Sequence, residues 1–196
     1  LIDKAFVDRW DYFVACLRKR NIYLLPDIVS TRAAWTSATV DFDMKTGMLF
    51  REDYRDNWRA GFHFMMKHVN PYTGTRMLDD PMIVGFTLMN EQDNQKNYWG
   101  ELNPEWKKWY LASHPGSKAP ELNVELLMKS QEARTWVENV LMGMSDFYMD
   151  EVRKIGFKGV VMNWDMYMRL MDIPPRLPMT AVAMHTYFCL LYTSPS

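Results

Sequence analysis

The chain has 196 residues, of which 48% are hydrophobic and 24% are charged, the ordinary balance of about one globular domain. This composition excludes disordered, collagen-like and coiled-coil proteins. Lys and Arg number 23 against 24 Asp and Glu, a formal net charge of −1 with no basic run, so we expect neither a nucleic-acid nor a membrane partner.

Apolar periodicity predicts helices alternating with strands along the chain. The apolar run at residues 82–89 lacks polar alternation, which is typical of a parallel strand that is buried on both faces. Asn21 and Gly156 can each end a helix in a left-handed conformation. In chain order, the expected elements are a helix at 4–20, a strand at 22–29, a helix at 54–68, a strand at 82–89, a long polar loop at 92–130, a helix at 136–152, and strands at 159–164 and 181–187.

Helices that connect successive strands imply right-handed crossovers and a parallel sheet, so the predicted fold class is α/β. Long loops in such folds usually lie at the carboxyl ends of the strands, where ligands bind. The apolar runs are far shorter than the roughly 20 residues that a membrane helix needs. We therefore expect no membrane-spanning helix.

Asn90 and Glu91 give the sharpest chemical signal, because they directly follow the apolar run at 82–89. A carboxylate at the end of a buried strand is partly desolvated, which raises its pKa toward the range of a general acid. The alternative is that the two residues cap the helix that follows.

His185 and Tyr187 lie at the carboxyl end of the last expected strand, where residues two apart point to the same side. They would therefore face one cleft. For either residue alone, a place in the core is the alternative interpretation.

With these two motifs, the sequence resembles the cellulase-like family 5 enzymes of glycoside hydrolase clan A. In that family the fourth strand of a (β/α)8 barrel ends in Asn-Glu, and the sixth strand often ends in His-x-Tyr. The resemblance covers residues 4–188 and implies an incomplete barrel fragment that runs from about helix two to strand six. It further implies that Glu91 is the acid/base of a retaining β-glycosidase, and that Asn90, His185 and Tyr187 contact the sugar.

Three positions depart from the family pattern. Val29 stands near the place where many members have a histidine, and Gln92 rather than proline follows Asn90-Glu91. The family's nucleophile is a glutamate on strand seven, and we can assign no residue of this chain to that role. We therefore expect the isolated chain to be inactive, even if it comes from an active enzyme.

Aromatic residues supply further candidate sugar contacts, because sugar rings pack on flat indoles. Trp164 ends the strand expected at 159–164, and Trp35 lies in a loop on the same side. By contrast, Trp10, Trp58 and Trp136 lie on helical stripes and are expected in the core. No histidine or cysteine pair has the spacing of a metal site, so neither metal nor cofactor is expected.

Both ends of the sequence suggest a fragment. Leu1 begins within a helical pattern, and residues 189–196 resemble a translated sequencing adapter, the alternative being an ordinary Ser/Pro-rich terminus. We thus expect residues 1–188 to be a partial catalytic barrel and 189–196 to be a non-native tail. The localisation and the oligomeric state are not set by the sequence; secretion or a periplasmic location follows only by analogy with polysaccharide-degrading enzymes.

The resulting hypothesis is a fragment of a retaining β-glycosidase acting on a poly- or oligosaccharide. A non-catalytic carbohydrate-binding or scaffold protein on the same fold is the alternative. The absence of a Gly-rich phosphate loop or a Gly-x-Ser-x-Gly motif argues against nucleotide binding and other α/β hydrolases.

Overall fold

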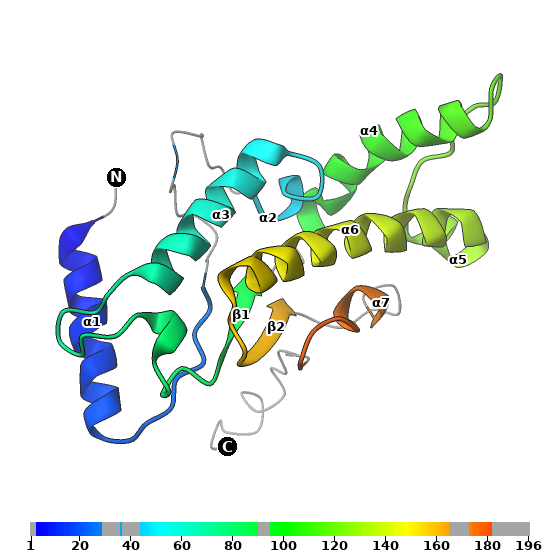
Figure 1. The fold of residues 1–196 in the computed structure, drawn as a ribbon. Coiled ribbons are helices and arrows are strands. Elements are labelled where there is room, and N and C mark those ends of the chain that lie inside the picture. The colour runs from blue at the N-terminus through cyan, green and yellow to red at the C-terminus, as the bar shows by residue number, and fades with distance from the viewer. Residues whose placement is uncertain (1–2, 29–35, 37–43, 90–94, 165–172, 182–196) are drawn as a thin grey trace, which may run out of the picture.

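The computed structural model describes residues 3–28, 36, 44–89, 95–164 and 173–181. Most of these residues are helical, and the described part contains two strands (Figure 1). The elements in chain order are α1 (Lys4–Lys19), α2 (Met44–Gly47), α3 (Glu52–Lys67), the 3-10 helix η1 (Met77–Asp79), β1 (Gly85–Met89), α4 (Gln95–Ser113), α5 (Val124–Lys129), α6 (Gln131–Ile155), β2 (Val160–Trp164) and α7 (Ile173–Arg176).

The two strands pair in parallel at the centre of the molecule. Gly85 lies opposite Val160 at one end of the pair, and Met89 lies opposite Trp164 at the other. Only glycine fits at position 85, because a Cβ atom there would lie 2.4 Å from the carbonyl oxygen of Val160. All five residues of β1 are buried, as its continuous apolar sequence predicts.

The expected strand at residues 22–29 is reduced to isolated parallel bridges beside β1. Leu24 pairs with Ile83, whereas Asp27 pairs with Thr87, so the register shifts by one residue between the two bridges. Pro26 lies between them and has no N–H to donate, which explains the break in the ladder.

α3 and α6 lie side by side over the strands, and α1 stands at the margin of the molecule (Figure 1). Trp58 of α3 is central to the core: its ring stacks on Phe62 at 4.8 Å and packs on Tyr148 of α6 at the same distance. The indole nitrogen of Trp58 also donates to the carbonyl of Leu88, 2.9 Å away. This bond fixes α3 to the end of β1.

The expectation of an incomplete (β/α)8 barrel is wrong. The described residues form a mostly helical fold with a two-stranded parallel sheet, and no curved multi-stranded wall is present among them. Of the other predicted strands, residues 22–28 form isolated bridges only, and the strand expected at 181–187 lies, apart from Ala181, outside the described residues. Thr180 and Ala181 do lie beside β2, because both backbone amides donate to the carbonyl of Val161.

The expected loop at residues 92–130 is also wrong, since it contains α4 and α5. Pro104 lies inside α4. Proline ordinarily disfavours the interior of a helix, so the sequence around it does not predict one. Leu102 and Trp106, four residues apart, are nevertheless fully buried. Tertiary packing of this stripe therefore outweighs the unfavourable local sequence.

The helices predicted at 4–20, 54–68 and 136–152 are confirmed as α1, α3 and α6. Asn21 follows α1 with φ 55°, and Gly156 ends α6 with φ 79°, both in the left-handed region. Most of the apolar stripe of α1 does not lie in the core, contrary to expectation. Only Asp11 and Val14 of this helix are buried.

Candidate functional site

Most of the predicted site residues lie outside the described residues. These are Trp35, Asn90, Glu91, His185 and Tyr187. The structure therefore describes the framework next to these positions: Glu91 follows the last residue of β1 by two positions. Trp164 is the last residue of β2, and only its backbone is described.

The carboxyl ends of β1 and β2 lie at one edge of the sheet, with Met89 in register with Trp164. Met89 is fully buried, and the bond from Trp58 to the carbonyl of Leu88 fixes the end of β1. This edge is the place where parallel α/β folds commonly present functional side chains. α4 begins at Gln95, four residues after Glu91, so neither Asn90 nor Glu91 directly precedes this helix as an N-cap would.

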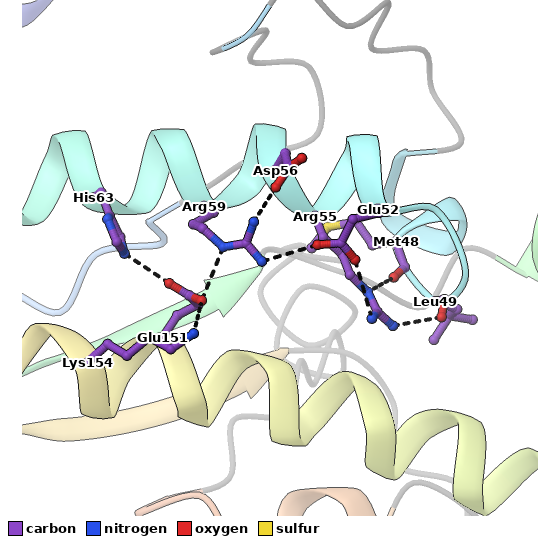
Figure 2. Close-up of polar contacts among 9 residues, drawn as sticks. All are labelled: Met48, Leu49, Glu52, Arg55, Asp56, Arg59, His63, Glu151 and Lys154. Carbon is purple, nitrogen blue, oxygen red and sulfur yellow. Dashed lines mark hydrogen bonds and ion pairs between the residues drawn. The ribbon is translucent and has the colours of Figure 1, made fainter.

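Within the described residues, a second group of polar side chains joins α3 to α6 (Figure 2). Glu151 of α6 is at its centre, with a side chain that is only 2% exposed. Its Oε1 atom accepts hydrogen bonds from Arg59 Nε at 3.1 Å and Lys154 Nζ at 2.8 Å, and its Oε2 atom lies 3.0 Å from His63 Nε2. One buried carboxylate thus has three basic partners.

The electrostatics favour the charged forms of Glu151 and Arg59. Burial by itself raises the pKa of Glu151, but the hydrogen bonds from Lys154 and Arg59 more than offset this, so its pKa is lowered from 4.5. Burial by itself lowers the pKa of Arg59, whereas its bonds to Glu151 and Glu52 raise it above the ordinary value. Glu151 is consequently ionised at neutral pH.

These properties suit a structural ion pair better than a catalytic acid. A general acid needs a raised pKa and access to substrate, and Glu151 has neither. Its partners Arg59 and His63 lie one helical turn apart on α3 and make the bridge to α6. The sequence analysis missed this group because spacing within a helix shows which residues share a face, not which helix that face meets.

Two further histidines also pair with carboxylates. His68 Nε2 lies 2.7 Å from Asp11 Oδ2, which attaches α1 to the segment after α3. His114 Nε2 lies 3.3 Å from Glu132 Oε1, between the end of α4 and the start of α6. Each pair thus joins two parts of the chain that are distant in sequence.

Searches for metal and membrane sites in the described ranges give no candidates. No group of three or more His, Cys, Asp or Glu side chains there could hold a metal ion. None of the helices in the same ranges is long and apolar enough to cross a membrane.

Comparison with known proteins identifies no relatives. No protein-family model matches the chain, and neither a curated protein nor a solved structure matches it.

Proposed function

We propose that this chain is part of a retaining β-glycosidase and that Glu91 is its general acid/base. The observation that carries the proposal is the position of Asn90-Glu91 directly after β1, a fully buried strand whose last residue pairs with Trp164 at the end of β2. The proposal depends on this strand-end position and on the residue pattern, and it does not require a barrel.

The chemistry needs a carboxyl group that can both donate and accept a proton. Glu91 would protonate the oxygen of the leaving group while a second carboxylate attacks the anomeric carbon, and Glu91 would then deprotonate the water that releases the sugar. The two carboxyl groups would stand about 5–5.5 Å apart. We assign the second carboxylate to no residue of this chain, so the chain alone is predicted to show no turnover.

The remaining predicted residues would bind the sugar. Trp164 offers an indole on which a sugar ring can pack, and Trp35 is a second candidate for the same role. The amide of Asn90 would bond the sugar hydroxyl next to the anomeric carbon, and His185 and Tyr187 would bond neighbouring hydroxyls. Carboxylates suffice for this chemistry, so we propose no cofactor.

The test uses the uninterrupted gene that contains this sequence. Its product is assayed on aryl β-glycosides and polysaccharides, beside the variant Glu91→Gln and the control Glu121→Gln, an exposed carboxylate. We expect Glu91→Gln to lower kcat by about 10²–10⁴-fold, the usual contribution of general acid–base catalysis. The control should retain full activity.

Two further measurements separate an acid/base role from damage to the fold. Sugar transfer to the enzyme from a dinitrophenyl glycoside should be largely kept in Glu91→Gln, because that leaving group needs no proton. Added azide should restore turnover, because azide attacks without a general base. A protein that binds polysaccharide but hydrolyses none would overturn the proposal in favour of a non-catalytic carbohydrate-binding protein.

A further inference from the structure

The segment at residues 22–28 has one bonded edge and one open edge. Toward β1, Leu24 donates to Met82 and accepts from Val84, and the carbonyl of Pro26 accepts from Thr87. The backbone groups of Tyr23 and Leu25 point the other way because they alternate with those of Leu24 and Pro26. They form no hydrogen bond with any described residue.

Apolar side chains are exposed along this open edge and on the helix before it. Tyr23 is 65% exposed and Leu25 is 43% exposed. On α1, Phe6 and Phe13 share one face and are 58% and 48% exposed. Figure 1 places α1 at the margin of the molecule, on the side of residues 22–28 that is away from β1. Exposed apolar side chains are thus present both on α1 and along the open edge that follows it in the chain.

Exposed basic residues lie along α1 and at its end. Arg9 lies on α1 between Phe6 and Phe13, and Lys19 and Arg20 end the helix just before the open edge; all three residues are exposed. Asp27, at the other end of the edge, already has an interaction within the chain. The exposed carboxylates of α1 are engaged as well, since Asp3 caps the helix and Asp8 accepts a hydrogen bond from Tyr72, so the charge that this surface offers to a partner is positive.

We propose that the outer edge of residues 22–27, together with the aromatic face of α1, binds an extended polypeptide strand with alternating apolar and acidic side chains. The strand would bond the backbone of Tyr23 and Leu25, as in β-strand addition to a sheet edge. Its apolar side chains would cover Phe13 and Leu25, and its carboxylates would pair with Arg9 and Arg20. A lipid surface fits less well, because acyl chains cannot bond the free backbone groups.

The first experiment measures binding of a labelled ten-residue peptide of alternating Val and Glu to the 196-residue chain by fluorescence anisotropy. The matched probe has Lys in place of each Glu. We expect the Glu peptide to bind at least tenfold more tightly than the Lys peptide. We also expect the difference to shrink in high salt, because exposed charges are screened.

Leu25→Pro tests the edge itself, since it removes one outward N–H and leaves the bonds of Leu24 and Pro26 to β1 in place. We expect at least a tenfold loss of Glu-peptide affinity with an unchanged circular dichroism spectrum. Met128→Ser, at a residue 77% exposed on α5, is the control and should bind normally.

Should Leu25→Pro fail to fold, the double variant Arg9→Glu and Arg20→Glu provides the test on exposed side chains. It should reverse the preference, so that the Lys peptide binds better. Equal binding of both peptides to the wild-type chain would overturn the proposal. So would a dimer that Leu25→Pro dissociates, which would make a second copy the occupant, or binding to phosphatidylserine vesicles without any binding of peptide.

Discussion

Glu151 shows at the scale of one residue how a buried charge can be tolerated. Removing a carboxylate from water costs several kcal/mol, and this cost is offset only when the geometry is good and the remaining lone pairs are bonded. Both oxygens of Glu151 have basic partners within 3.1 Å, from α3 as well as from its own helix. The carboxylate therefore joins α3 and α6. An uncharged residue at this position would leave Arg59 and His63 without the carboxylate that they contact on α6.

Replacing Glu151 by glutamine should destabilise the fold. The amide keeps the size of the side chain but loses the charge, and charge-assisted hydrogen bonds contribute about 1.5–3 kcal/mol. We expect a loss of this size in the free energy of unfolding, measured by urea denaturation. Glu138→Gln is the control, because Glu138 lies on the same helix and no ion pair is found for it among the described residues. Equal stability of the two variants would show that Glu151 does not hold the helices together.

The contribution of Glu151 should also depend on pH. Its pKa in the folded protein is lowered from 4.5, so the folded state favours the ionised form. The stabilisation is then fully present above 4.5 and is lost as the pH falls through the lower, folded-state pKa. We expect the difference in unfolding free energy between wild type and Glu151→Gln to shrink as the pH falls below 4.5. A difference that stayed unchanged between pH 5 and the acid limit of folding would contradict this.

At the scale of elements, the close approach of β1 and β2 depends on glycine. Gly85→Ala would place a Cβ atom against the backbone of Val160, which cannot move without disturbing the ladder. Overpacking of this kind costs up to about 3 kcal/mol, and we expect a loss near that limit in chemical denaturation.

The matched variant is Gly143→Ala in the exposed interior of α6, where a Cβ atom would meet nothing within 4 Å. It should instead stabilise the protein by about 0.8–1.0 kcal/mol, the difference in helix propensity. If both variants destabilised equally, the contact between the strands would not be the cause.

α4 shows which elements the sequence could not predict. Inside it Pro104 removes a helical hydrogen bond, and the segment around it is polar. Its stability depends on distant partners: Asn103 donates to Leu122 and accepts from it, and Trp106 donates to Pro120. These contacts are made across the turn that follows α4, and no local pattern reveals them. By contrast, α6 carries a strong apolar stripe and a glycine end signal, and its position could be predicted.

At the scale of the whole molecule, local signals predicted α1, α3, α6 and both strands, but they missed the other helices and did not predict how many segments form a sheet. The apolar run of β1 and its parallel partner β2 are as expected, whereas Pro26 breaks the ladder of the neighbouring segment. Of the candidate site, only the backbone position of Trp164 can be compared with the structure. The chemical assignment of Glu91 depends on residue types at a strand end and stays a prediction.

The uneven burial of the helices predicts uneven local stability. α1 and α3 both have 16 residues, but α1 buries two of them while α3 buries six, including Trp58 and Phe62. Segments with few buried contacts open at lower free energy than the global unfolding reaction. We therefore expect amides of α1 to exchange with deuterium at least tenfold faster than those of α3, measured by mass spectrometry on peptides from the two helices. The two helices have equal length, so length does not account for the difference. Equal protection of α1 would mean that the His68–Asp11 and Asp8–Tyr72 contacts hold it to the body as firmly as the core holds α3.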